Sequence, residues 1–304
     1  MIVGPTCSGK TTLSLLLAEM INAEIISADS RQVFKYLDIG TAKPSRLALE
    51  KIKHYFIDEL NPDEIFNSSI FAQQSEQTIT SIIKNRKIPV VAGGSGLYIK
   101  ALLDGISDSA DTNTGIRSEL LELRKRFGNE YLFNELKKVD EVSASKMLPQ
   151  NWKRVMRAIE VFRLTGKPIW KHHQEAIRES KFGFRQIGLL RDRTRLYLSI
   201  EKRVDEMIRN GLVDEVKSIL DLGFDKSLNS LNTVGYKEII QYLNSEIKLD
   251  RAIELIKRNT RHYAKRQMTW FNADKRIEWH KIDSESDLNH LAKQIAKDIY
   301  ERKN

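Results

Sequence analysis

The sequence predicts an α/β protein in which helices flank a parallel sheet and the chain carries an inserted all-helical lobe. Short apolar runs alternate with helical patterns early in the chain, which indicates strand–helix–strand units with parallel strands. Residues 107–185 are instead charged and helix-favouring, without a strand pattern. At 304 residues the chain is about twice as long as a typical domain. We therefore expect a core built from residues 1–106 and 186–304, with 107–185 as the insertion.

The elements follow in order along the chain. The apolar run 1–3 predicts the first strand, and apolar residues at helical spacing over 11–20 predict the first helix. A serine-capped helix over 68–85 leads into a later strand, and apolar positions three and four apart predict a helix over 203–223. The other apolar runs that predict strands lie at 24–28, 55–57, 88–92 and 186–190.

The first strand leads into a loop with the spacing G-x-x-x-x-G-K-[ST], which is typical of phosphate binding. This phosphate loop consists of Gly4, Pro5, Thr6, Cys7, Ser8, Gly9, Lys10 and Thr11. Its glycines let the backbone N–H groups surround phosphate, Lys10 places a positive charge among the oxygens, and the Thr11 hydroxyl can bind Mg²⁺. We therefore predict a P-loop NTPase-like sheet and a substrate with a phosphate chain. The loop does not say which compound binds.

Composition narrows the class of protein. The net charge of +9 favours a polyanionic partner larger than a nucleotide, although a solvated surface with extra lysines explains it equally well. The single cysteine, Cys7, excludes an internal disulfide and fits a reducing compartment. No targeting segment or membrane-spanning run is recognisable. We expect a soluble, cytoplasmic protein that acts as a monomer and has no membrane partner.

Two further strand ends carry residues suited to chemistry. Asp29 could hold magnesium in a nucleotide-hydrolysing enzyme, take a proton from a nucleophile near the phosphates, or cap a helix that starts near Arg31. The run 88–92 ends in Gly-Gly-Ser-Gly instead of the acidic residues expected of a motor-type ATPase, and Ser95 could donate its hydroxyl to phosphate. Since parallel strands share their carboxyl edge, these loops predict one crevice.

Basic residues at helical spacing are candidates for contacts with a nucleic acid. Arg154 and Arg157 lie three apart beside Lys153 in the insertion. Lys265 and Arg266 have aromatic residues interleaved around them. Such groups can hold phosphates and stack bases, but a solvated helix face or ordinary core packing explains them too.

Taken together, these segments resemble the bacterial tRNA dimethylallyltransferases, also called tRNA isopentenyltransferases or IPP transferases. They run in family order across almost the whole chain, and the DIGTAKP and AKRQ runs are the specific ones. The matching segments are GPTCSGKT at 4–11, SADSRQVFKYLDIGTAKP at 27–44, GGSGLYIKALL at 93–103, RVMRAIEV at 154–161, TGKP at 165–168, VGYKEI at 234–239 and AKRQMTW at 264–270.

The resemblance implies transfer of a dimethylallyl group from dimethylallyl diphosphate to N6 of adenosine 37 in tRNA, with diphosphate as the leaving group and Mg²⁺ as the cofactor. The product would be N6-dimethylallyladenosine. In that chemistry Lys10, Thr11, Ser95 and Arg203 stabilise the developing charge, and Thr11 holds the metal. Asp29 matches the general base that removes a proton from the amine. Asp29, Ser95 and Arg203 are thus the expected catalytic residues.

The resemblance also implies a tRNA surface. Adenosine 37 lies in a loop, so its base must be extruded to reach a buried crevice, while the inserted lobe grips the anticodon arm. The positions that match tRNA-contact segments, with Lys265 and Arg266 added, are Asp29, Ser30, Arg31, Gln32, Ser95, Arg117, Lys153, Arg154, Arg157, Thr233, Val234, Gly235, Lys265 and Arg266.

Several positions depart from the family's usual residues. Cys7 stands where the family usually has Ala, and Ser95 replaces the more usual Thr while keeping the hydroxyl. Ser199 replaces an Arg four residues before Arg203. We therefore expect the diphosphate site to have one positive charge fewer than usual.

Other functions fit parts of the sequence. A P-loop small-molecule kinase could use Asp29 to accept a hydroxyl proton, and would make ADP, whereas the transferase needs no ATP. An enzyme that prenylates free adenine nucleotides would not need the helical insertion. A non-catalytic RNA-binding protein would not need Lys10, Thr11 and Asp29 intact.

Overall fold

The part of the chain that contains the strands forms one parallel sheet with helices on both sides. The computed structural model describes residues 1–106, 113–176 and 180–301. In the sheet, strands follow the order β3-β2-β4-β1-β5-β6, and every pair is parallel. This confirms the predicted α/β class. The strands are β1 (Ile2–Val3), β2 (Ala23–Ser27), β3 (His54–Tyr55), β4 (Ile88–Gly93), β5 (Gln186–Leu190) and β6 (Ile277–Lys281).

The chain divides into two compact units. One contains the sheet and consists of Met1–Ile99 with Phe182–Asn304, and the other consists of Lys100–Lys181. The helices of the sheet-containing unit are α1 (Lys10–Ile21), α2 (Arg46–Lys51), α3 (Ser68–Lys84), α9 (Arg193–Arg209), α10 (Leu212–Asp221), α11 (Tyr236–Leu243), α12 (Leu249–Asn272) and α13 (Glu285–Glu301); α4 (Gly96–Asp104) begins in this unit. The second unit, called the helical unit below, contains α5 (Thr114–Val139), α6 (Glu141–Ala144), the 3₁₀ turn Pro149–Asn151, α7 (Trp152–Thr165) and α8 (Ile169–Glu175).

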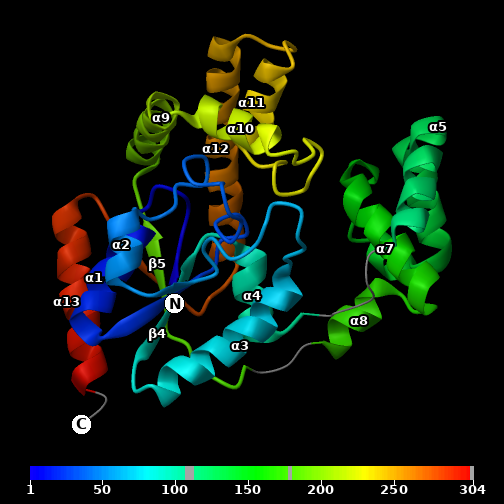
Figure 1. The fold of residues 1–304 in the computed structure, drawn as a ribbon. Coiled ribbons are helices and arrows are strands. Elements are labelled where there is room, and N and C mark those ends of the chain that lie inside the picture. Colours follow the sequence, from blue (N-terminus) through cyan, green and yellow to red (C-terminus); the bar gives the residue numbers. More distant parts are fainter. Residues whose placement is uncertain (107–112, 177–179, 302–304) are drawn as a thin grey trace. The chain divides into compact units, whose positions relative to one another are not determined.

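A hydrophobic core lies between the sheet and two helices. Leu13 and Leu17 of α1 pack with Leu288 and Leu291 of α13 against strand residues such as Ile25. Figure 1 shows α1 and α13 side by side, with α3 on the other side of the sheet. Their apolar residues recur at three and four, so each helix buries one stripe. This packing holds the strands whose carboxyl ends carry the functional loops.

Three local predictions were wrong. Residues 30–36 form turns and a single bridge at Phe34, where a helix was expected to begin near Arg31. The cap of α3 is Asn67, whose side chain accepts hydrogen bonds from the N–H groups of Ser69 and Ile70, so the cap is not a serine. The helix expected over 203–223 is split into α9 and α10, because Gly211 takes a left-handed conformation with φ 96°.

A buried carboxylate organises the helical unit. The side chain of Glu160 is fully buried and accepts hydrogen bonds from Arg117 Nε at 2.9 Å, Arg157 Nη1 at 2.8 Å and the Asn113 N–H at 2.8 Å. Burial raises the pKa of Glu160, but the hydrogen bonds from the two arginines outweigh it and lower the pKa overall. Arg117 of α5, expected to contact tRNA, therefore also joins α5 to α7, whereas Arg157, expected to do the same, pairs with Glu160 within α7.

In the ranges that the structure describes, no helix is both long and apolar enough to cross a membrane.

Replacing Glu160 with Gln is expected to lower the free energy of unfolding by about 1–3 kcal/mol, because two arginines lose their buried partner. The folded-state pKa of Glu160 lies below its ordinary value of 4.5. Its contribution is therefore complete above that value and is lost as the pH falls through the folded-state pKa. Thermal unfolding followed by circular dichroism should show a difference between wild type and Glu160→Gln at pH 7 that shrinks below about pH 4.5.

The matched control is Glu119→Gln. Glu119 pairs with Arg163 in the same unit, but its side chain is 57% exposed. Exposed pairs contribute roughly 0–1 kcal/mol, so this variant should unfold almost as wild type does. Equal destabilisation by both variants would contradict the role given to Glu160.

Candidate active site

The phosphate loop joins β1 to α1 in backbone conformations that suit glycine. Gly4 has φ 145° and Gly9 has φ 100°. A Cβ atom at Gly4 would lie 2.9 Å from the Leu189 carbonyl oxygen, so a side chain does not fit there. Gly9 is the N-cap of α1 and provides no side-chain cap, so the first N–H groups of the helix remain available to an anion.

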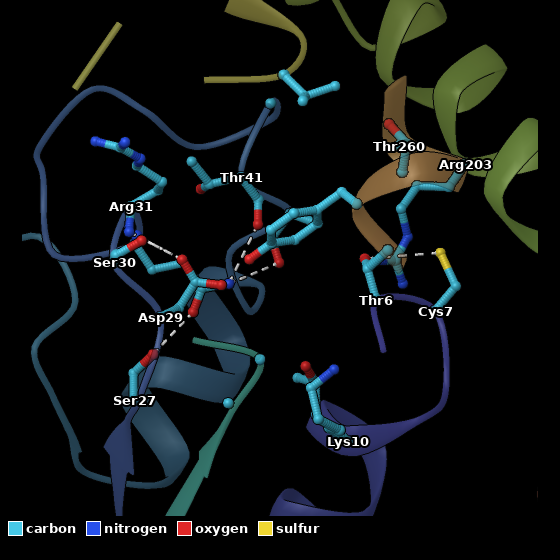
Figure 2. Close-up of a pocket in the computed structure, with 18 of the residues that line it drawn as sticks. Thr6, Cys7, Lys10, Ser27, Asp29, Ser30, Arg31, Thr41, Arg203 and Thr260 are labelled. Atoms are coloured by element: carbon cyan, nitrogen blue, oxygen red, sulfur yellow. Dashed lines mark hydrogen bonds between the residues drawn. The ribbon is translucent and has the colours of Figure 1, made fainter. Parts of the chain in front are cut away.

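A cavity of about 440 Å³ opens beside this loop. Its walls come from loop residues 6–11, the turn 29–32, the loop 40–42, the strand end 92–94, the segment 232–234, and helices α9 and α12. Figure 2 shows Asp29 and Ser30 on one side, with Thr6, Lys10 and Arg203 on the other. The three strand ends predicted to form one crevice do so.

The phosphate-loop side carries positive charge without a carboxylate partner. Lys10 Nζ donates to the Pro5 carbonyl at 2.6 Å, and Arg203 Nη1 donates to Thr6 Oγ1 at 3.4 Å. In the described part of the chain, neither cation forms a salt bridge. Burial and the nearby charge of Arg203 lower the pKa of Lys10 to about 8. The cavity is therefore electrostatically prepared for an anion.

The opposite side carries the carboxylate of Asp29. Its Oδ1 accepts hydrogen bonds from the N–H groups of Arg31 at 2.9 Å and Gln32 at 3.4 Å, which closes the turn after β2. None of the described residues donates a hydrogen bond to Oδ2. Asp29 lines the cavity, so this oxygen can accept a proton from a bound nucleophile. Asp29 therefore closes a turn and caps no helix, and this local role leaves its second oxygen free to act as a general base.

Gln32 connects this turn to the loop 40–42. Its Nε2 donates to the carbonyls of Thr41 at 3.2 Å and Ala42 at 3.3 Å, and its Oε1 accepts from Ser27 Oγ at 3.0 Å. Gln32 was expected to contact tRNA, and it lines the cavity. Here its side chain also holds two walls of the cavity together.

Glu215 of α10 holds the start of the loop that Gln32 contacts. Its carboxylate accepts hydrogen bonds from the N–H groups of Asp38, Ile39 and Gly40 at 3.1, 2.7 and 3.1 Å, and from the Tyr236 hydroxyl at 2.6 Å. A Cβ at Gly40 would lie 2.4 Å from the Tyr236 ring, so only glycine fits. Glu215 was not predicted from the sequence, because nothing distinguishes it there from the other charged residues of an amphipathic helix.

Gln267 of α12 joins the phosphate loop to the Gly-Gly-Ser-Gly loop. Its Oε1 accepts from the Thr6 N–H at 2.8 Å, and its Nε2 donates to the Gly94 carbonyl at 2.9 Å. A Cβ at Gly94 would lie 2.2 Å from that Nε2, and one at Gly96 would lie 2.3 Å from the Trp270 ring. The AKRQMTW segment therefore fixes two loops of the site. Gln267 was not among the expected site residues, although it lies in a segment that carries the resemblance.

Ser95 supports the turn that carries Asp29. Its hydroxyl accepts from the Ser30 N–H at 3.0 Å, and Ser95 is not among the cavity-lining residues. Tyr263 does line the cavity. Burial, followed by the charge of Asp29, raises the pKa of Tyr263, so its hydroxyl stays protonated beside the carboxylate. Contact between Ser95 and phosphate stays a prediction.

The remaining expected residues are distributed unevenly. Thr233, Val234 and Arg266 line the cavity, whereas Gly235 and Lys265 do not. The expected residues that belong to the helical unit are Arg117, Lys153, Arg154 and Arg157. Cavity-lining residues that were not among the expected site residues include Thr41, Met207, Lys237, Thr260, Tyr263 and Gln267.

Oxygen ligands for a divalent cation are present in the cavity. Thr11 and Asp29 both line it, and hard cations such as Mg²⁺ prefer oxygen ligands such as a hydroxyl and a carboxylate. Across residues 1–106, 113–176 and 180–301 there is no cluster of three or more His, Cys, Asp or Glu that could hold a metal alone. These residues fit an ion that takes its other ligands from a bound phosphate and from water.

Comparison with known proteins agrees with this geometry. Residues 32–274 match the model of the family described as IPP transferase. The tRNA dimethylallyltransferase of Acetivibrio thermocellus is 48% identical over 281 residues, which cover 91% of this chain and 90% of that protein. The tRNA dimethylallyltransferase of Alkaliphilus oremlandii is 43% identical over 299 residues, covering 98% and 96%.

A solved structure supports the same assignment. The full-length tRNA isopentenylpyrophosphate transferase of Bacillus halodurans aligns with a TM-score of 0.72 at 35% identity, over 99% of this chain and 96% of that one. The resemblance inferred from the sequence motifs is therefore confirmed. The chain belongs to the IPP transferase family.

Proposed function

We propose that this protein transfers a dimethylallyl group from dimethylallyl diphosphate to N6 of adenosine 37 in tRNA and releases diphosphate. The observation that carries the proposal is the separation of charge across one cavity. Lys10 and Arg203, which have no ion-pair partner in the described residues, lie on one side, and the Asp29 carboxylate lies on the other. Such a cavity can stabilise an anionic leaving group while it deprotonates a nucleophile. The curated relatives are named as tRNA dimethylallyltransferases.

The phosphate-loop side stabilises the leaving group. As the bond between the prenyl carbon and the diphosphate oxygen breaks, its electron pair stays on the oxygen, and negative charge accumulates there. Lys10, Arg203 and the phosphate loop all line the cavity, so their positive charges and N–H groups can stabilise this charge. When Mg²⁺ is bound, with Thr11 among its ligands, it neutralises further phosphate charge.

The Asp29 side prepares the nucleophile. The lone pair of an exocyclic adenine amine is delocalised into the ring, so the amine attacks poorly. Asp29 Oδ2 accepts a proton from N6 as the new carbon–nitrogen bond forms. The N–H groups of Arg31 and Gln32, which donate to its Oδ1, hold the carboxylate in place. The carbon–nitrogen bond forms as the carbon–oxygen bond breaks. The proton from the amine goes to Asp29, and the electron pair of the broken bond leaves with diphosphate.

The tRNA surface is proposed around the cavity mouth and on the helical unit. Near the mouth it includes the turn 30–32, the segment 233–235, Lys265 and Arg266. On the helical unit it includes Lys153, Arg154, Arg117 and Arg157. The net charge of +9 supports a polyanionic partner, and one relative of known structure is a eukaryotic dimethylallyltransferase acting on tRNA, with a TM-score of 0.81 at 29% identity over 97% of this chain and 76% of that one.

The decisive experiment combines the protein with Mg²⁺, dimethylallyl diphosphate and unmodified tRNA. Mass spectrometry of the digested tRNA should find N6-dimethylallyladenosine, and diphosphate should appear in equal amount without ATP. A kinase, the alternative considered from the sequence, would instead consume ATP and form ADP. Absence of prenylated adenosine with a folded protein would overturn the proposal.

Replacing Asp29 with Asn should lower kcat by roughly 10²–10⁴-fold, because the amide cannot accept the proton while its Oδ1 can still close the turn. The tRNA affinity measured by filter binding should stay near that of wild type. Asp221→Asn, an exposed position at the end of α10, is the control and should keep full activity. Near-normal kcat in Asp29→Asn would refute the general-base role.

Binding of inorganic diphosphate should be coupled to proton uptake near pH 8. In the free protein the pKa of Lys10 is about 8, and a bound anion favours its charged form, which raises that pKa. The contribution of Lys10 to the affinity should therefore be constant below pH 8 and fall as the pH rises above it. Titration calorimetry in buffers of different ionisation enthalpy measures the uptake.

The matched variant for this measurement is Lys10→Arg, which keeps the charge but cannot lose its proton. Because diphosphate itself titrates, the quantity of interest is the difference in proton uptake between wild type and variant. No difference would contradict the effect assigned to Lys10.

Replacing Arg154 with Ala should raise the KM for tRNA and reduce the salt dependence of binding, while the KM for dimethylallyl diphosphate stays unchanged. Arg154 is exposed and no ion pair is described for it, so this variant leaves the buried Glu160 pairs intact. Arg163→Ala, which removes a partly exposed partner of Glu119, is the control. If the salt dependence is unchanged in Arg154→Ala, Arg154 does not contact tRNA and belongs to an ordinary solvated helix face.

A further inference from the structure

Arg191 reaches the phosphate loop from the connection between β5 and α9. Its Nη1 donates hydrogen bonds to the Cys7 carbonyl at 3.2 Å and to Ser199 Oγ at 3.1 Å. Cys7 Sγ also lies 3.9 Å from the Ser199 carbonyl oxygen. One guanidinium group therefore connects the loop to the first half of α9.

The charge of Arg191 has no compensating carboxylate. Among the described residues Arg191 forms no salt bridge, and its Nε is buried without a hydrogen-bond partner. Removing a guanidinium partly from water without an acidic partner costs free energy, and proteins normally compensate such a charge with an anion. Cys7, the residue that Arg191 holds, lines the cavity that is proposed to bind the anion. The structure thus places an uncompensated cation directly behind the phosphate loop.

The contact with Cys7 also orients a donor of the loop. Cys7 has φ 62°, a left-handed conformation that costs about 1–2 kcal/mol in a residue with a side chain. Because the C=O and N–H of one peptide point in opposite directions, holding the Cys7 carbonyl also orients the Ser8 N–H. In this structure that N–H makes only a 3.4 Å contact with the Pro5 carbonyl. This weak contact leaves the Ser8 N–H able to donate to a bound phosphate while the peptide stays in place.

We propose that Arg191 is a positioning residue of the diphosphate site, which holds the Cys7 peptide in place and supplies positive charge behind the phosphate loop. The inference rests on the proposed function, in that the bound anion is the diphosphate of the prenyl donor. Arg191 also replaces the positive charge that was expected to be missing because Ser199 stands where the family usually has Arg. The charge is supplied by a side chain that arrives at Ser199 from outside the helix.

The position of Ser199 allows a relocation test. Ser199 and Arg203 are one turn apart on α9 and therefore share a face. Arg203 lines the cavity, so a longer side chain at position 199 would extend from beside Cys7 toward the same cavity. Ser199→Arg should thus restore a positive charge to the loop when Arg191 is neutralised.

The experiment measures binding of inorganic diphosphate with Mg²⁺ by calorimetry, which does not depend on tRNA or on turnover. Arg191→Met should raise the Kd by roughly tenfold, and Arg191→Met with Ser199→Arg should recover most of that loss. In the prenylation assay, Arg191→Met should raise the KM for dimethylallyl diphosphate while the KM for tRNA stays unchanged. Arg193→Met removes an exposed arginine at the start of α9 and should bind diphosphate as wild type does.

Two results would overturn the proposal. One is wild-type affinity for diphosphate in Arg191→Met. The other is a loss of affinity that Ser199→Arg does not recover, accompanied by a lower unfolding temperature of the free protein, which would make Arg191 a purely structural residue.

A second variant is available if Arg191→Met fails to fold. Arg191→Lys keeps the charge but cannot bridge both acceptors as a planar group does, and an intermediate affinity supports the proposal. If diphosphate binding depends on Arg191 but no prenylated tRNA is formed, the proposed function is refuted while the role of Arg191 in binding the anion stands.

Discussion

The pairing of β4 with both β1 and β2 is the constraint on which the site depends. Ile2 and Val3 pair with Ala92 and Gly93, and Ser27 pairs with Ala92. Three strands therefore end at the same level, and the loops that follow them meet at one edge of the sheet. The fit is close, because a Cβ at Gly93 would lie 2.1 Å from the Ala28 carbonyl oxygen. Any shift of register would separate the phosphate loop from Asp29.

This edge keeps opposite charges apart. Asp29 and Lys10 line the same cavity, yet the carboxylate is bonded to its own turn and the ammonium to the Pro5 carbonyl. A direct ion pair would neutralise both groups and leave neither free for a substrate. Because the backbone satisfies each of them locally, Lys10 remains available to an anion and Asp29 to a proton. The local hydrogen bonds thus preserve the chemical difference between the two walls.

Helices from the second half of the chain hold these loops in position. Gln267 of α12 joins the phosphate loop to Gly94, and Glu215 of α10 gathers three N–H groups of the loop that Gln32 contacts. Arg191 adds a third connection, to Cys7. Loops alone would sample many conformations, and each of these side chains replaces that freedom with a small number of hydrogen bonds. The precision of the site therefore originates away from the strands that carry it.

The sequence by itself determined the α/β class, the phosphate loop, Asp29 as the residue opposite it, and the family, because these are written in short runs of neighbouring residues. Local spacing did not predict the turn at 30–36 or the break at Gly211, where single backbone conformations decide. Only the tertiary structure identified Gln267, Glu215 and Arg191, and it gave Arg157 a buried partner in Glu160. The physical reason is distance along the chain: Thr6 and Gln267 are 261 positions apart, and a hydrogen bond between such residues leaves no periodic pattern in the sequence.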